Sequence, residues 1–207
     1  FHRRLVPILN FKDLKTSRFA VGTIPLSVTW GTLKQGADMD RYIVHGTSRL
    51  TAWFIGLVTT VWLTPREGSR INIGLQLLSK RDHDTARQLQ YDLSPVSDLS
   101  TAGQTVFCSR FLSTRAEDGG CFEEVYDAQD RLLPWGQMPQ ITADRIQKTD
   151  LVLAECAIKR FRSKSRTSFR KGWHEWAVNF DLIRVALLSA GPGAAGDLVP
   201  DDCDVDL

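Results

Sequence analysis

Apolar and polar residues alternate most regularly over residues 70–81. The apolar positions are Ile71, Ile73, Leu75 and Leu77, and the opposite positions are Arg70, Asn72, Gly74, Gln76 and Lys80. A period of two is typical of a strand that buries one face. This segment is therefore predicted to be a strand with its apolar side against a core.

Residues 48–63 precede it and are rich in Trp, Phe, Ile, Val and Thr, which favours a strand. Strict alternation divides them into two faces: Trp53, Ile55, Leu57, Val61 and Leu63 on one, and Phe54, Gly56, Val58, Thr60 and Trp62 on the other. Turn-forming residues at 64–69 predict a hairpin between the two strands. Glycines on the outer face at 56 and 74 indicate strong strand curvature or close approach of a ligand, and curvature is the more frequent reason.

Two longer extended runs follow, at residues 150–161 and 175–188. Shorter segments predict a helix over 82–91 capped by Asp82 or Asp84, a strand over 104–113, a turn at 115–120 with a returning strand at 121–126, and one or two helical turns at 142–148. Residues 20–30 have strand character that Pro25 confines to a sheet edge or interrupts. We find no internal repeat and no alternating βα pattern. The expected fold is mainly β: a closed β-barrel with one or two short helices.

A densely basic stretch lies between the two long runs. Residues 159–174 hold no acidic residue and seven cations, which are Lys159, Arg160, Arg162, Lys164, Arg166, Arg170 and Lys171. Three aromatic residues, Phe161, Phe169 and Trp173, stand among them. Cations attract phosphates and aromatic rings stack on unpaired bases, so this composition favours single-stranded nucleic acid. The alternative is a solvated hairpin loop that its charge keeps soluble.

Composition and cysteine spacing limit the classes of protein and of binding site that the chain can represent. A hydrophobic fraction of 43% is ordinary for a globular protein, and a net charge of +2 means that any polyanion site depends on local clustering. The four cysteines and four histidines lack zinc-ligand spacing, so we expect free thiols, with a Cys108–Cys121 disulfide left open. No apolar run is long enough to span a membrane and no secretory signal is evident. We expect an intracellular protein, nuclear or cytoplasmic.

Motifs of catalysis are missing from the sequence. It has no phosphate-binding G-x-x-x-x-G-K-[ST], no G-x-S-x-G and no H-E-x-x-H. His174 is a lone histidine where the basic stretch meets a strand, and Glu123 and Glu124 are typical of solvated hairpin acids. We expect no enzyme, no metal and no cofactor.

Three segments carry a family resemblance. Residues 57–62 followed by 70–75 resemble the first hairpin of an OB-fold. Residues 148–156 resemble the K-x-D-x-V-x-V-E-G strand of single-stranded-DNA-binding proteins, with Cys156 where that family commonly has Gly, and residues 176–188 are similar to their closing strand. The middle section is longer than a minimal OB barrel needs. The resemblance covers roughly residues 49–188. We therefore expect an OB-like β-barrel domain (47–190), preceded by an N-terminal extension (1–46) that has no counterpart in that family and followed by a flexible acidic tail (191–207).

An OB-fold binds oligonucleotides on the face of its second and third strands, between the loops that join strands one and two and strands four and five. Those loops would be residues 65–69 and 162–173. The implied phosphate contacts are Lys159, Arg162, Lys164, Arg166, Arg170 and Lys171, and the implied stacking residues are Phe161, Phe169 and Trp173. The groove floor would hold Arg70, Asn72, Gln76 and Lys80. Phe54 and Trp62 would be further platforms, or would pack beneath the N-terminal extension.

The implied function is non-catalytic binding of single-stranded DNA or RNA. The acidic end, residues 201–207, resembles the tails with which such proteins dock a partner protein. It is either a solubilising end or a competitor of nucleic acid for the basic stretch. A homo-oligomer is left open. The alternative for the whole chain is a structural or interaction β-barrel, viral capsid-like or movement-protein-like.

Overall fold

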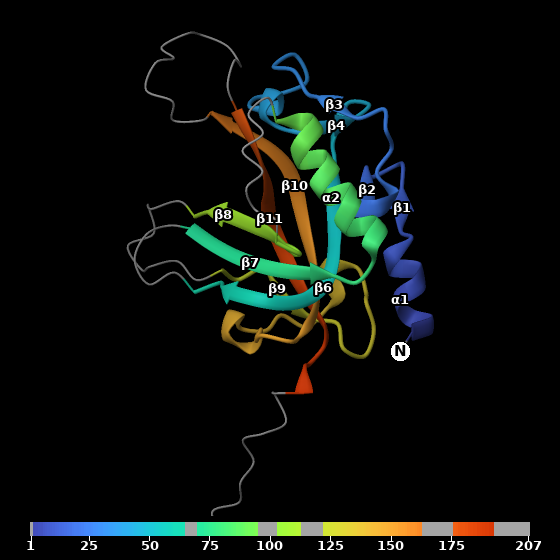
Figure 1. Ribbon diagram of the computed structural model, residues 1–207, viewed down its shortest axis with the longest axis vertical. Coiled ribbons are helices and arrows are strands. Elements are labelled where there is room, and N and C mark those ends of the chain that lie inside the picture. The colour runs from blue at the N-terminus through green and yellow to red at the C-terminus, as the bar shows by residue number, and fades with distance from the viewer. Residues whose placement is uncertain (1, 65–69, 95–102, 113–121, 163–175, 193–207) are drawn as a thin grey trace, which may run out of the picture.

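The computed structural model describes residues 2–64, 70–94, 103–112, 122–162 and 176–192 (Figure 1). Within these ranges the helices are α1 (His2–Leu9) and α2 (Lys80–Leu93), and short 3-10 turns are η1 (Val21–Thr23), η2 (Met39–Arg41), η3 (Trp135–Gln137) and η4 (Ala143–Arg145). The strands are β1 (Lys12–Asp13), β2 (Arg18–Ala20), β3 (Thr29–Trp30), β4 (Ile43–His45), β5 (Ser48–Arg49), β6 (Thr51–Trp62), β7 (Arg70–Leu77), β8 (Thr105–Phe111), β9 (Val125–Asp127), β10 (Leu151–Arg162) and β11 (Trp176–Ser189). The chain is therefore mainly β, as predicted.

Five of these strands pair in succession and return to their starting point. β6 is antiparallel to β7, and β7 is antiparallel to β8. β8 is parallel to β11, β11 is antiparallel to β10, and β10 is antiparallel to β6. In Figure 1, β10 and β11 rise steeply while β7 and β8 cross them at a large angle. The predicted antiparallel pairing of residues 57–62 with 70–75 is confirmed by β6 and β7, and residues 65–69 of the expected turn lie outside the described residues.

The inward side chains of these strands form the main core. Ile71, Ile73, Leu75 and Leu77 are all buried in it, which confirms the predicted face of β7. Phe54 of β6 and Phe180 of β11 meet at its centre, with ring centroids 4.5 Å apart. At roughly 25 cal/mol per Å² of apolar surface, residues of this kind supply most of the favourable free energy of folding.

A β-bulge changes the face of β6 partway along its length. The register with β7 shifts between Val58 and Thr60. Leu63 therefore joins the core that holds Phe54 and Val58, whereas Trp62 is 53% exposed. Strict alternation had placed Leu63 with Trp53, and that assignment was wrong beyond the bulge because the extra residue reverses the side-chain direction.

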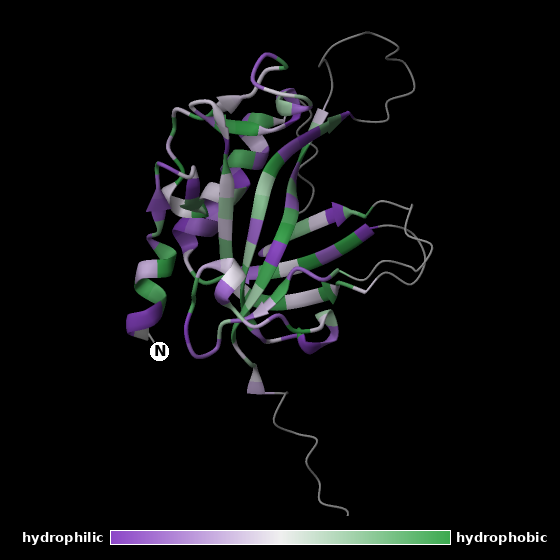
Figure 2. Ribbon diagram, turned by 180° about the vertical axis from the view of Figure 1, so that it is seen from behind, coloured by the Kyte–Doolittle hydropathy of each residue, from purple (hydrophilic) through white to green (hydrophobic). Residues whose placement is uncertain are grey.

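A second core lies on the other side of the long strands. It contains Trp53 and Ile55 of β6, Leu153 of β10 and Ala186 of β11, and α1 and the segment 128–138 cover it. Burial on both sides explains why these strands read as nearly continuous apolar runs. Figure 2 shows apolar residues along much of β10, with hydrophilic residues at its upper end.

The N-terminal residues join the sheet. β2 lies parallel to β6, and β3, β4 and β5 form a small separate sheet that contacts β10 through a Tyr42–Lys159 bridge. Strand structure in residues 20–30 is confined to the two ends, Ala20 and Thr29–Trp30. The expected run is interrupted by η1 and by Pro25, which cannot donate a ladder hydrogen bond.

Two further predictions need correction. The helix predicted over 82–91 exists, but it begins earlier: the side chain of Ser79 caps it by accepting from the backbone N–H of Asp82 at 3.3 Å. The strand predicted to return from β8 is β9, which pairs in parallel with β11. The turn expected at 115–120 lies outside the described residues.

The predicted free thiols are found at Cys108 and Cys156, which are fully buried. Burial is the main cause that raises the pKa of the Cys156 thiol well above its ordinary value. Cys121 and Cys203 lie outside the described residues. In the described part of the chain, neither helix is long and apolar enough to cross a membrane.

Candidate nucleic-acid interface

A row of hydrogen-bonded polar side chains crosses the outer face of β7, β8 and β11. Arg70 donates from Nη2 to Ser109 Oγ at 3.2 Å, and Ser109 Oγ donates to Asn179 Oδ1 at 3.0 Å. Asn179 Nδ2 donates back to the Ser109 carbonyl at 3.0 Å. These bonds fix the orientation of three side chains from segments far apart in the sequence.

Lys159 extends this row onto β10. It lies opposite Asn179 in the β10–β11 register, and its Nζ is 3.6 Å from Asp181 Oδ2. The same Nζ lies 5.5 Å from the centre of the Tyr42 ring. Arg49 stands 5.1 Å from that ring, so Tyr42 is flanked by two cations.

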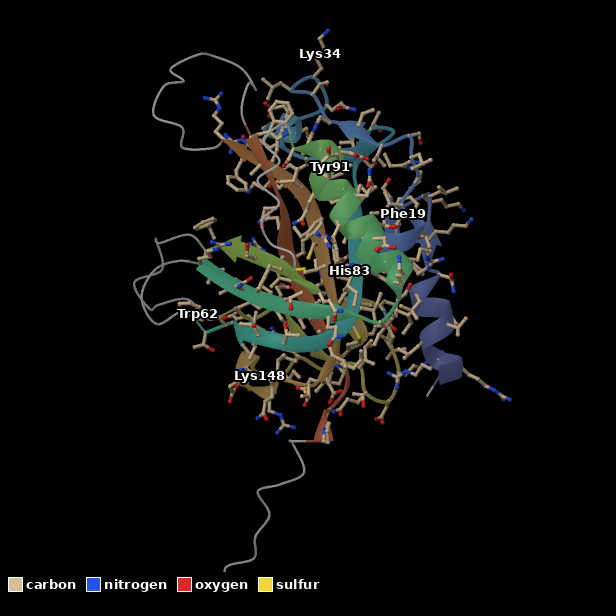
Figure 3. The ribbon with its side chains drawn as sticks, viewed as in Figure 1. Phe19, Lys34, Trp62, His83, Tyr91 and Lys148 are labelled. Carbon is tan, nitrogen blue, oxygen red and sulfur yellow. The ribbon has the colours of Figure 1, made fainter. Side chains whose placement is uncertain are left out.

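Exposed aromatic rings border the row on the β7–β8 side. Phe111 is 71% exposed, Phe107 is 44% exposed and Trp62 is 53% exposed. Cross-strand pairing sets Phe111 beside Arg70, Phe107 beside Gly74, and Trp62 beside Asn72. In Figure 3, Trp62 lies at the end of β6. Large rings exposed together on one strand face are available to stack on a flat ligand.

Contacts within the protein itself account for both glycines that were predicted on the outer face. Gly74 lies on that face, whereas Gly56 pairs with the buried Leu77 and faces the main core. A Cβ at Gly74 would lie 3.0 Å from a Phe107 ring atom and 3.0 Å from Thr59 Oγ1. A Cβ at Gly56 would lie 2.5 Å from the Gln76 carbonyl oxygen, where β6 approaches β7. Close approach of the chain's own strands and of the Phe107 ring therefore accounts for both residues.

Further polar and aromatic groups gather where β10 ends. A hollow of about 600 Å³ is lined by residues that include Leu33, Asp38, Arg41, Phe161 and Arg162. Phe161 is 49% exposed. Beneath it, the Arg160 guanidinium lies 4.6 Å from the Trp30 ring centre and 5.1 Å from that of Trp176. Burial lowers the pKa of Arg160 from its ordinary value, and the nearby Asp40 opposes this shift.

The structure brings part of the predicted site together. Arg70, Asn72 and Lys159 share the outer face, and Gln76 is exposed there with its Nε2 3.4 Å from Gln104 Oε1. Phe161 and Arg162 lie at the end of β10. Six predicted contacts lie outside the described residues: Lys164, Arg166, Phe169, Arg170, Lys171 and Trp173.

Two predicted contacts are corrected. Phe54 is fully buried against Phe180, so it has no free face for a base. Lys80 is in the first turn of α2, not on β7, and its Nζ lies 2.5 Å from Asp84 Oδ2. The sequence-based prediction did not include Phe107 and Phe111 among the candidate site residues. The signal was present, because residues 105, 107, 109 and 111 alternate with the buried Val106 and Cys108.

Metal ligands are not evident here. Within the ranges that the structure describes, no group of three or more His, Cys, Asp or Glu side chains is placed to hold a metal ion.

Comparisons with known proteins returned two solved structures of low similarity. No protein-family model matches the chain, and no curated protein matches it either. The structure of gp2.5, a single-stranded DNA binding protein encoded by bacteriophage T7, aligns over 77% of this chain and 100% of its own, with 9% identity and a TM-score of 0.42. A single-stranded DNA-binding protein from bacteriophage Enc34 aligns over 80% of this chain and 91% of its own, with 10% identity and a TM-score of 0.40. Similarities this low establish neither a family nor a function for this chain.

Proposed function

We propose that this chain is a non-catalytic single-stranded nucleic-acid-binding protein built on an OB-like closed barrel. The ring of paired strands supports the fold. Taken in chain order, β6, β7, β8, β10 and β11 would be strands one to five, and the fifth would pair with the third and the fourth. Oligonucleotides bind an OB-fold on the face of strands two and three, which here is the outer face of β7 and β8.

The observation that carries the proposal is the composition of that face. Phe111 exposes its ring beside Arg70, and Phe107 and Trp62 expose theirs beside Gly74 and Asn72. A hydrogen bond holds the Arg70 guanidinium against Ser109. Stacking on such rings needs bases with free faces, which single strands offer and duplexes do not. The cations supply sequence-independent attraction to phosphates. We place the nucleic-acid strand along β7 and β8, and it continues past Lys159, Phe161 and Arg162 toward the rest of the basic stretch.

Either DNA or RNA satisfies this arrangement, because stacking and phosphate attraction are common to both. The residues of the basic stretch beyond 162 are proposed as additional phosphate and base contacts. Their part is distinguishable from that of the sheet face, because the two sets lie on separate segments and can be substituted independently.

The test is titration of the full chain with fluorescently labelled oligo-dT at low salt, followed by anisotropy and by tryptophan emission. We expect saturable binding that weakens steeply with added salt, quenches tryptophan and resists competition by duplex DNA. The double variant Phe107→Ala/Phe111→Ala should bind more weakly, whereas Tyr91→Ala, an exposed aromatic on α2, should bind like the parent (Figure 3). No binding to oligo-dT or oligo-U at low salt would overturn the proposal. Large symmetric assemblies in sedimentation would then favour the structural β-barrel alternative.

A further inference from the structure

A second hollow lies away from this face and shares no residue with it. It has a volume of about 460 Å³ and is formed by α1, β2, β6 and the segment 131–135. Aliphatic and proline side chains form much of its wall, among them Pro7, Ile8 and Leu133. Three arginines, Arg4, Arg18 and Arg131, also line it.

The charge of this hollow is positive and incompletely balanced. Glu155, which is 1% exposed, lies 3.3 Å from Arg18 Nε and 3.0 Å from Arg184 Nε, so one carboxylate serves two guanidinium groups. Arg4 donates to the carbonyl oxygens of Ala128 and Gln129, which orient it without neutralising it. Arg131 is exposed. None of the described residues that line the hollow is acidic, so it favours an anionic ligand.

The aromatic rings at the hollow are already engaged by the protein. Phe11 stacks on Trp53 with ring centroids 4.0 Å apart. Arg184 lies over Trp135 at 5.0 Å, and Tyr126 meets the Trp135 ring edge-to-face. Their faces are therefore less available to a base than those of Phe107 and Phe111. A ligand that fits this hollow needs carboxylates to pair with the arginines and aliphatic side chains to pack against the walls. An acidic peptide meets both needs better than a nucleotide does.

The chain itself contains such a peptide, and the last described residues before it lie near the hollow. Residues 201–207 hold four aspartates together with Val205 and Leu207. The backbone N–H of Ala190, just after β11, donates to Gln129 Oε1 at 3.3 Å, and Arg4 binds the carbonyl of the same Gln129. An extended chain reaches ~3.3 Å per residue, so residues 193–200 alone can span roughly 25 Å. Tethering raises the effective concentration of the peptide at a site this close.

We infer that this hollow is an intramolecular docking site for residues 201–207. The aspartates face Arg4, Arg18 and Arg131, and Val205 and Leu207 pack against Pro7, Ile8 and Leu133. This location differs from the basic stretch, where the sequence alone suggested that the acidic end competes with nucleic acid. The inference does not rest on the proposed nucleic-acid function.

The test uses the full chain carrying Cys121→Ser, labelled at Cys203 with bimane, a fluorophore that tryptophan quenches at short range. The buried Cys108 and Cys156 leave Cys203 as the reactive thiol. We expect the emission to be quenched, and an excess of unlabelled peptide of sequence 201–207 should restore it. Arg131→Glu should also restore the emission, and it should raise the Kd of the unlabelled peptide by about fivefold or more, because it reverses one exposed charge of the site. Arg145→Glu, an exposed arginine on η4, is the matched control and should leave the emission quenched.

Three results would overturn the inference. The first is no quenching in the parent chain, or equal quenching in the parent and Arg131→Glu, with far-ultraviolet circular dichroism confirming that the variant is folded. The second is release by Arg70→Glu but not by Arg131→Glu, which would place the acidic segment on the nucleic-acid face. The third is quenching that falls on dilution, which would show that the segment docks on a second copy.

Discussion

The guanidinium of Arg70 lies 5.6 Å from the centre of the Phe111 ring, and the two residues are direct cross-strand neighbours on β7 and β8. A cation and an exposed ring are thus presented together, while a hydrogen bond to Ser109 limits the freedom of the cation. A single-stranded ligand that stacked on Phe111 would bring its phosphates within reach of Arg70. The pair is therefore the natural starting point for testing the outer face.

Replacing Phe111 with alanine should weaken oligo-dT binding with little effect on folding. A base–aromatic stack contributes roughly 1–3 kcal/mol, so the expected loss is about 5- to 150-fold in Kd. Because the side chain is 71% exposed, the midpoint of thermal unfolding should barely move. Anisotropy titration and a thermal melt measure the two effects. A fall in both affinity and stability by comparable free energies would show that Phe111 acts through packing instead.

Arg70→Gln should change the salt dependence of binding as well as its strength. Each phosphate contact on a single strand contributes about 0.7 to the slope of log K against log salt, so the variant's slope should be shallower by roughly that amount. Lys148→Gln, an exposed cation near η4, serves as the control and should keep the parent slope (Figure 3). An unchanged slope for Arg70→Gln would remove Arg70 from the phosphate contacts.

Glu155→Ala should destabilise the fold. The substitution leaves Arg18 and Arg184 facing each other without their shared carboxylate. Removing one partner of a fully buried pair costs about 3–5 kcal/mol, and the expected loss here is about 2–3 kcal/mol because the Arg18 side chain is 38% exposed. Urea denaturation measures the change, with the exposed Glu123→Ala as control. Equal stability of the two variants would contradict a structural role for the ion pair.

Asp82 should make the fold less stable as pH rises. Burial is the main cause that raises the pKa of its carboxyl above the ordinary value, with Arg81 opposing the shift. The folded state therefore holds a proton that the unfolded state has already released. The stabilisation that this carboxyl contributes is fully present below its pKa in the unfolded state. It is lost as pH rises through its pKa in the folded state. Asp82→Asn should abolish this loss, so its stability relative to the parent should grow across that window.

The control for this titration is Asp84, whose exposed carboxyl has its pKa lowered chiefly by the hydrogen bond from Lys80. Its contribution has the opposite sign: it is present above the unfolded pKa and lost as pH falls through the folded pKa. Urea unfolding of Asp82→Asn and Asp84→Asn from pH 3 to 7 separates the two cases. A parent and an Asp82→Asn chain with parallel profiles would show that Asp82 titrates normally.

Local pattern was sufficient for much of the sheet. The period of two at Ile71, Ile73 and Leu75 identified the strand and its buried face, because alternation depends only on neighbouring residues. The long apolar runs became β10 and β11, because strands buried on both faces read as nearly continuous apolar segments. In residues 105–111, alternation with the buried Val106 and Cys108 indicated that Phe107 and Phe111 face outward. The mainly β class followed from these segments.

Tertiary contacts decided the rest. The bulge in β6 that turns Trp62 outward depends on pairing with β7, and the burial of Phe54 depends on Phe180, which lies far along the chain. The N-cap of α2 is Ser79, whereas the sequence pattern predicted Asp82 or Asp84 in that role. Asp82 is instead buried in the first turn of α2. Phe107 and Phe111 become a surface beside Arg70 only through the register of β7 with β8. Alternation along the sequence predicts which side chains share one face of a strand. The register between strands, which depends on long-range pairing, determines which residues of neighbouring strands lie side by side.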